Sequence, residues 1–239
     1  MERLSFRRFI PNIFTFVSLT LGVTSIKFAF ESRWEISVGF IVFASFLDNL
    51  DGKLARLLKS NSNFGVELDS LSDFISFGVA PVVVVYFWNI SANINNGWAL
   101  VIFYAICSSS RLAKFNLVSL EGEKKDIKFF QGISTPAAAG AVLLPMMISF
   151  RFDTLIFNQP YICVFTIFTA SILMITNIPT FSLKGISLKK KFIPFFLLLM
   201  AGLISLLISD FWLGMILIIS TYYLSIPLAV FRYKSINKI

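Results

Sequence analysis

Eight apolar runs, most of them long enough to cross a membrane as a helix, constrain the fold of this chain more than any other feature. A membrane helix takes about 20 apolar residues. Hydrophobic residues make up 56% of the chain and charged residues 14%, whereas a soluble domain is about 25% charged. We therefore expect an all-α protein, a polytopic membrane helix bundle in which residues 1–239 form a single transmembrane domain. The runs lie near residues 13–30, 36–58, 71–88, 98–117, 137–150, 161–178, 192–208 and 212–231. The fifth run is short for a span, so it either re-enters the membrane or extends back through Pro136.

The distribution of basic residues predicts the orientation of this bundle. The chain has 21 Lys and Arg against 13 Asp and Glu, a net charge of +8. Cytoplasmic loops of membrane proteins carry an excess of Lys and Arg. With a cytoplasmic N-terminus and eight spans, only Lys27, Arg33 and Arg151 fall on the far side of the membrane. We therefore expect cytoplasmic N- and C-termini, contacts of the basic loops with anionic membrane lipids, and no nucleic-acid partner.

Histidine is absent, and the two cysteines, Cys107 and Cys163, both lie inside apolar runs. Histidine is the side chain best suited to acid and base chemistry at neutral pH, and zinc prefers histidine and cysteine ligands. The composition therefore argues against zinc, thiol-redox and disulfide-framework functions. The placement of the few acidic residues becomes the main evidence for function.

Four of the acidic residues gather where the second run ends and the third begins: Asp48, Asp51, Asp69 and Asp73. The spacings i, i+3 and i, i+4 place each pair on one face of its helix. Carboxylates in an apolar helix are costly unless a cation compensates their charge, and their oxygens suit Mg²⁺, Mn²⁺ or Ca²⁺. The pattern predicts a two-metal site for phosphoryl transfer at the cytoplasmic ends of the second and third spans.

Small residues and one arginine accompany these acids. Gly52, Ala55 and Gly65 would let a bulky anionic ligand approach the backbone, and Arg56 supplies a planar donor for phosphate. Two other interpretations stay open at this point. The acids are loop residues paired with basic neighbours such as Lys53, or they line the cation path of a transporter. A transporter predicts acids spread through the depth of the bilayer, whereas these acids cluster at one end.

The stretch Asp48-x2-Asp51-Gly52-x2-Ala55-Arg56-x8-Gly65-x3-Asp69-x3-Asp73 resembles the signature of the CDP-alcohol phosphotransferase family and matches it at every fixed position. The resemblance implies transfer of a phosphatidyl-type group from a CDP-linked lipid to an alcohol, with release of CMP. It also implies roles for the matching residues. Asp73 is implied to be the general base. The implied ligands of two Mg²⁺ or Mn²⁺ ions are Asp48, Asp51, Asp69 and Asp73, and the implied cradle for the cytidine diphosphate is Gly52, Ala55, Arg56 and Gly65.

Further segments resemble the bacterial and archaeal phosphatidylserine synthase branch of this family. They include Pro11-Asn12-x2-Thr15 followed by Gly22, and the run from Ser72 to Pro81; the others are Arg111-Leu-Ala-Lys-Phe-Asn116, Phe130-Gln-Gly132 and Pro136-Ala-Ala-Ala-Gly140. The sequence has Lys114 where that branch suggests Arg, and Ile133-Ser134 where it suggests Leu-Pro. Arg111 is suited to grip the carboxylate of an amino-acid acceptor through two hydrogen bonds. The remaining candidate acceptor-binding residues are Lys114, Asn116 and Ser134.

We therefore expect a CDP-diacylglycerol serine O-phosphatidyltransferase of the inner (cytoplasmic) membrane, with its active site facing the cytoplasm. Its expected partners are CDP-diacylglycerol, L-serine and membrane lipids. Glycerol phosphate, inositol phosphate and choline stay open as alternative acceptors. Gly39, Gly140 and Gly202 are candidates for close helix contacts, including contacts within a homodimer.

Overall fold

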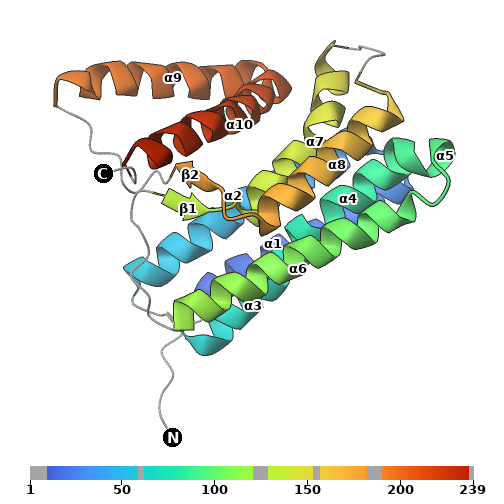
Figure 1. Ribbon diagram of the computed structural model, residues 1–239, viewed down its shortest axis with the longest axis horizontal. Helices are drawn as coiled ribbons and strands as arrows, with labels where there is room; N and C mark the ends of the chain where they lie inside the picture. The colour runs from blue at the N-terminus through green and yellow to red at the C-terminus, as the bar shows by residue number, and fades with distance from the viewer. Residues whose placement is uncertain (1–9, 59–61, 121–128, 153–156, 182–189, 237–239) are drawn as a thin grey trace, which may run out of the picture.

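The computed structural model describes residues 10–58, 62–120, 129–152, 157–181 and 190–236 (Figure 1). Each of the eight apolar runs forms a helix, as predicted, and the third forms one continuous rod, Asn63–Asn93, in which two π-helical turns interrupt the α-helix. In chain order the elements are α1 (Ile10–Phe30), α2 (Trp34–Leu57), α3 (Asn63–Asp73), the π-helical η2 (Phe74–Val79), α4 (Ala80–Val85), the π-helical η3 (Tyr86–Ile90), α5 (Ser91–Asn93), α6 (Trp98–Leu120), β1 (Phe129–Gln131), α7 (Thr135–Phe152), α8 (Pro160–Ile175), β2 (Pro179–Phe181), the 3-10 turn η5 (Lys190–Phe192), α9 (Ile193–Ser209) and α10 (Phe211–Ile236).

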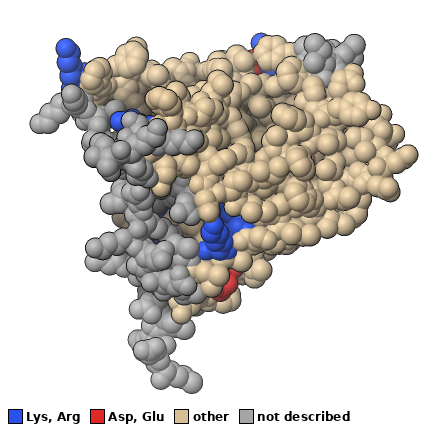
Figure 2. Space-filling model, in the orientation of Figure 1, with Lys and Arg blue, Asp and Glu red and all other residues tan. Residues whose placement is uncertain are grey.

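The helices have the lengths and surfaces of an integral membrane protein. Among the described residues, four helices are long and apolar enough to cross a membrane: Ile10–Phe30, Asn63–Asn93, Thr135–Phe152 and Phe211–Tyr233. The fifth apolar run extends back through Pro136, because α7 begins at Thr135. Most of the face drawn in Figure 2 is uncharged, and its Lys, Arg, Asp and Glu side chains stand in a few small groups. Such a surface suits contact with lipid tails.

Small residues on one face of α1 let its neighbours approach closely. Thr15, Ser18, Gly22, Ser25 and Ala29 are all buried. The Ser18 hydroxyl donates to the Ala44 carbonyl of α2 at 3.2 Å. The Ser76 hydroxyl of η2 donates to the Ser18 carbonyl at 3.1 Å. Because lipid supplies no hydrophobic force between helices, such close packing and interhelical hydrogen bonds hold a membrane bundle together. Helix α1 therefore fixes α2 and the α3 rod relative to each other.

A two-stranded antiparallel ribbon, which the all-helical expectation did not include, lies against α10, with β1 preceding α7 and β2 following α8 (Figure 1). In β1 and β2, Phe129 lies opposite Phe181 and Gln131 opposite Pro179. Gly132 follows β1 with a φ of +70°. Its N–H donates to the Ile178 carbonyl at 2.8 Å, and the next N–H donates to the Leu173 carbonyl at 3.2 Å. The loop before α7 thereby donates hydrogen bonds to a carbonyl in the last turn of α8 and to one just before β2, which holds these segments together.

Gly132→Ala is expected to lower the free energy of unfolding by about 2 kcal/mol or more. The left-handed conformation alone costs an L-residue about 1–2 kcal/mol, and a Cβ would lie 2.9 Å from the Thr176 carbonyl oxygen. Thermal unfolding in detergent measures the change. Gly39→Ala is the matched control, since a Cβ at Gly39 in α2 meets no described atom within 4 Å and alanine favours a helix. An unchanged midpoint for Gly132→Ala would contradict the strained turn.

Of the three glycines singled out in the sequence, only Gly140 makes a close helix contact within the described chain. A Cβ at Gly140 would lie 3.3 Å from Ile219 of α10, whereas those at Gly39 and Gly202 would meet no described atom within 4 Å. Gly140 thus serves packing inside one chain. No contact between chains bears on the homodimer, which stays a prediction.

The three basic residues assigned to the far side of the membrane are all engaged locally. Lys27 pairs with Glu31 at 3.4 Å, and the Arg33 guanidinium lies 4.8 Å from the centre of the Phe28 ring. Arg151 at the end of α7 forms a short ion pair with Asp210 in the turn between α9 and α10. The Leu213 N–H and the Arg151 guanidinium hold the pKa of the Asp210 carboxyl below its usual range. This ion pair ties the α9–α10 hairpin to the rest of the bundle.

Candidate active site

The acidic residues converge at one end of the bundle. Asp48 and Asp51 lie in the last turns of α2, and Asp69 lies in α3. One carboxylate oxygen from each of these three residues lies within 4.8 Å of those from the other two. Helices α2 and α3 reach this arrangement because both pack on α1. The spacing in the sequence placed each pair of acids on one helix face, and the structure brings three of the four acids together.

Asp73 stands beside this cluster, one turn further along the rod than Asp69. Its carboxyl group lies close enough to those of Asp48, Asp51 and Asp69 to interact with them electrostatically. The Oδ1 atom of Asp73 is buried and has no hydrogen-bond partner among the described residues. The Arg111 guanidinium of α6 interacts with Asp73 electrostatically. Asp73 therefore presents an unused oxygen next to the three clustered carboxylates.

These donors fit hard divalent cations. All of them are carboxylate oxygens, which Mg²⁺ and Mn²⁺ prefer, and several like charges in so small a volume favour a bound cation. The alternative in which the acids pair with basic neighbours finds no support in the described part of the chain. Lys53 is exposed there, and the Arg56 Nε donates instead to the Gly52 carbonyl at 2.9 Å. The assignment of the four aspartates as metal ligands stays a prediction.

Thr15 of α1 belongs to the site, although the sequence reading did not assign it a role. Its hydroxyl donates to Asp51 Oδ2 at 2.8 Å, and the Ser72 hydroxyl of α3 donates to the Thr15 carbonyl at 3.1 Å. A Cβ at Gly65 would lie 3.1 Å from Asn12 Oδ1. The sequence did contain a signal for this contact, the segment Pro11-Asn12-x2-Thr15. We had interpreted that segment only as a resemblance to one branch of the family. Helix α1 thus orients the Asp51 carboxylate and lies against Gly65 in the first turn of α3.

Thr15→Val is expected to lower kcat/KM about tenfold. The valine keeps the shape of the side chain but removes a hydrogen bond to a charged group, and such a bond contributes about 1.5–3 kcal/mol. Steady-state activity at several cation concentrations measures the effect, which is largest when the cation is scarce. Thr20→Val on the exposed face of α1 is the control, since its hydroxyl donates only to the Phe16 carbonyl of its own helix. Equal activity in both variants would remove Thr15 from the site.

The residues predicted to bind the cytidine diphosphate include exposed positions at the end of α2. A Cβ at Gly52 would meet no described atom within 4 Å. Gly65 lies in the first turn of α3, where its N–H donates to the capping hydroxyl of Ser62 at 3.0 Å. Arg56 is exposed beside Gly52. The side chain of Ala55 lies outside the described residues. The arrangement leaves room for a ligand here, and the binding roles stay predictions.

The predicted acceptor residues separate into two groups. Arg111 is partly buried and donates from Nη1 to the Thr135 hydroxyl at 3.3 Å. Asn116 donates to the Ser70 hydroxyl at 3.0 Å, which places it against α3. Lys114 and Ser134 are exposed and make contacts that stabilise the fold. The Lys114 ammonium donates to Asn177 at 2.6 Å, and the Ser134 hydroxyl accepts from the Ala137 N–H at 3.4 Å at the start of α7. Of these four predicted residues, Arg111 is the one whose positive charge interacts with the Asp73 carboxylate.

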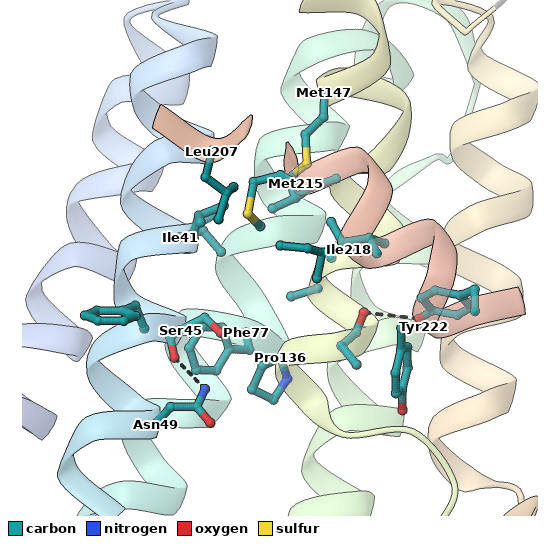
Figure 3. A pocket seen from close by; sticks show the side chains of 18 residues that line it. Ile41, Ser45, Asn49, Phe77, Pro136, Met147, Leu207, Met215, Ile218 and Tyr222 are labelled. Atoms are coloured by element: carbon teal, nitrogen blue, oxygen red, sulfur yellow. Dashed lines mark hydrogen bonds between the residues drawn. The ribbon is translucent and has the colours of Figure 1, made fainter. Parts of the chain in front are cut away.

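An apolar cavity of about 440 Å³ lies between α2, η2, α7, α9 and α10 (Figure 3). Its end nearer the acidic cluster carries Ser45 and Asn49 of α2, with the Asn49 amide donating to the Ser45 carbonyl at 2.8 Å. Met147 and Leu207 line the other end. Asn49 follows Asp48 in the chain, so this end of the cavity lies along the same helix as the acidic residues of α2, although none of the four aspartates lines the cavity. Such a shape suits a molecule with a polar head and an apolar tail.

A family model described as CDP-alcohol phosphatidyltransferase matches residues 8–178, which include the whole acidic site. The chain belongs to the CDP-alcohol phosphatidyltransferase family. A CDP-diacylglycerol–serine O-phosphatidyltransferase of Mycobacterium leprae is 32% identical over 227 residues, covering 94% of this chain and 75% of its own. A protein of that name from Helicobacter pylori strain 26695 is 36% identical over 169 residues, 70% of each chain. Another, from Methanocaldococcus jannaschii, is 38% identical over 110 residues, 45% of this chain and 48% of its own. Membership of this family identifies the chain as a membrane-bound transferase.

Proposed function

We propose that the chain transfers the phosphatidyl group of CDP-diacylglycerol to the hydroxyl of L-serine, giving phosphatidylserine and CMP. The observation that carries this proposal is the convergence of Asp48, Asp51 and Asp69 near Asp73, whose Oδ1 atom has no hydrogen-bond partner among the described residues. The names of the relatives from M. leprae and H. pylori support serine as the acceptor. In this proposal the cavity holds an apolar segment of the lipid, and the diphosphate lies over the acidic cluster.

The reaction is a displacement at the phosphorus that carries diacylglycerol. A bond forms between the serine hydroxyl oxygen and this phosphorus, and the bond from the phosphorus to the bridging oxygen of CMP breaks. Asp73 Oδ1 takes the hydroxyl proton, and CMP leaves with the bridging oxygen. Two bound Mg²⁺ or Mn²⁺ ions, held by Asp48, Asp51, Asp69 and Asp73, would neutralise the diphosphate and the leaving group. Thr15 holds Asp51 in place, and Arg111 holds the serine carboxylate.

The same proposal places the enzyme in the inner (cytoplasmic) membrane. The chain then crosses the bilayer eight times with both termini in the cytoplasm, because this topology puts 18 of its 21 basic residues on that side. The acidic cluster lies where α2 ends and α3 begins, and this connection is cytoplasmic in that topology. The active site therefore faces the cytoplasm, where serine and CMP are soluble.

Release of CMP with a panel of acceptors tests the function. Purified protein in detergent receives CDP-diacylglycerol, Mg²⁺ or Mn²⁺, and one of serine, glycerol phosphate, inositol phosphate or choline. Serine is expected to exceed every other acceptor at least about tenfold in kcat/KM, a difference of about 1.4 kcal/mol in transition-state binding. A phosphorylated acceptor in first place would overturn serine but keep the reaction class. No CMP release with any alcohol would overturn the proposed function.

A further inference from the structure

A π-helical turn, η2, begins directly after Asp73 in the rod that carries it. The Ala80 N–H at the end of this turn donates to the Ile75 carbonyl, five residues back, whereas an α-helix pairs residues four apart. Such turns inside α-helices are rare and occur often at functional sites. Pro81 gives a local reason for the irregularity, because a proline has no N–H for the Phe77 carbonyl four residues before it. The rod thus departs from α-helical geometry next to the proposed base.

Tyr104 of α6 supplies a hydrogen-bond donor to that same carbonyl. Its hydroxyl donates to the Phe77 oxygen at 3.1 Å, and both side chains are fully buried. A buried acceptor is costly without a partner, so this bond stabilises the turn where Pro81 removes a backbone donor. Helix α6 also packs tightly here, since a Cβ at Gly78 would overlap the Ser108 hydroxyl. The conformation of η2 therefore depends on its contact with α6.

Asp73 lies within a segment that is bonded to two neighbouring helices. On the α6 side, the Asn116 amide donates at 3.0 Å to a serine hydroxyl of α3 before Asp73, and Tyr104 bonds after it. On the α1 side, the hydroxyls of Ser72 and Ser76 each donate to an α1 carbonyl at 3.1 Å. Because these bonds hold the backbone on both sides of Asp73, they determine the direction of its carboxylate.

We infer that Tyr104 is a positioning residue for the transfer reaction: through its bond to the Phe77 carbonyl it holds the π-helical turn that fixes the direction of the Asp73 carboxylate. This inference rests on the proposed function, in which Asp73 takes the proton of the acceptor hydroxyl. Tyr104 acts on the reaction only through the turn. A catalytic group displaced by about 1 Å can lose about 10²-fold in rate. Loss of the Tyr104 hydroxyl therefore impairs the chemical step and spares substrate binding.

Tyr104→Phe is expected to lower kcat about tenfold and to leave KM for the lipid and for the alcohol within about twofold. The phenylalanine keeps the ring but donates no hydrogen bond, and an aligned base is needed only in the transition state. CMP release per folded protein is measured with the alcohol that the parent uses best. Amide hydrogen exchange of residues 70–80 is expected to become about tenfold faster, because loss of a bond to a buried acceptor eases local opening.

Ser37→Ala is the matched control for a lost hydroxyl. The Ser37 hydroxyl donates to the Ser25 carbonyl at 2.8 Å, so this variant also removes one buried bond between helices, but in the first turn of α2 and away from the acidic cluster. It is expected to lower the unfolding midpoint in detergent as Tyr104→Phe does, with kcat and the exchange of residues 70–80 unchanged. Ser76→Ala removes a bond that holds η2 to α1 and is expected to lower kcat in the same direction as Tyr104→Phe.

A parent protein that releases no CMP with any alcohol overturns both the proposed function and this inference. With an active parent, an unchanged kcat in Tyr104→Phe overturns the inference alone, because the tyrosine then only stabilises the fold. A lower kcat without faster exchange in residues 70–80 also overturns it, since the effect does not pass through the turn. An equal fall in kcat in Ser37→Ala does the same, because any weakening of the bundle then lowers the rate.

Discussion

Asp73→Asn is expected to lower kcat for CMP release about a thousandfold and to leave the protein folded. The amide keeps the size of the side chain but cannot take the proton from the attacking hydroxyl, and general base catalysis contributes about 10²–10⁴ in rate. The Oδ1 atom of Asp73 is buried and has no hydrogen-bond partner among the described residues, so it is free to accept that proton. Steady-state CMP release measures kcat, and thermal unfolding in detergent reports on the fold.

The matched control for this change is Glu67→Gln on the same helix. Glu67 is exposed, so the variant removes a negative charge near the site without touching the cluster. Its activity is expected to stay within about twofold of the parent protein, because exposed charges contribute little. Activity of Asp73→Asn above about a tenth of the parent would exclude Asp73 as the base, since it would fall short of the weakest effect of a general base.

Exhaustive removal of divalent cations is expected to abolish activity, and Mg²⁺ or Mn²⁺ is expected to restore it. The carboxylates of Asp48, Asp51 and Asp69 lie close together and are all negatively charged. Without a cation they would repel the negatively charged diphosphate. Chelation followed by back-titration measures the loss and the recovery. We expect less than about 1% of the activity to remain without cations, since metal ions supply several kcal/mol of charge stabilisation.

Asp69→Asn gives an independent check on the cation dependence. Loss of one carboxylate from the cluster is expected to raise the cation concentration needed for half-maximal activity at least about tenfold. Glu67→Gln, two residues away, is expected to leave that concentration unchanged. Full activity after chelation would contradict the metal site, and so would an unchanged cation requirement in Asp69→Asn.

The helices were predictable because their signals are local. A run of about 20 apolar residues is helical in a membrane whatever its neighbours are, since the backbone must satisfy its own hydrogen bonds there. The short ribbon of β1 and β2 was not predictable in this way. Each strand has three residues, and they lie about 50 positions apart in the chain. Their pairing depends on how α6, α7 and α8 bring the two segments together.

One part of the candidate site was likewise predictable from the sequence, and another part was not. The spacing of Asp48, Asp51, Asp69 and Asp73 showed from the sequence which acids share a helix face, and the structure brings three of them to within 4.8 Å of one another. The contribution of Thr15 was missed, because nothing in its local sequence shows that its hydroxyl reaches a carboxylate 36 residues away.

The sequence by itself determined that the chain is a bundle of membrane helices with a cluster of acids at the end of two of them. Apolar length and the spacing of residues along one helix are properties of neighbouring residues, so a sequence shows them directly. Only the tertiary structure decided which distant side chains meet. It brought the Arg111 guanidinium to the Thr135 hydroxyl, the Lys114 ammonium to Asn177 and the Thr15 hydroxyl to Asp51. Such meetings depend on how whole helices pack, which no local pattern encodes.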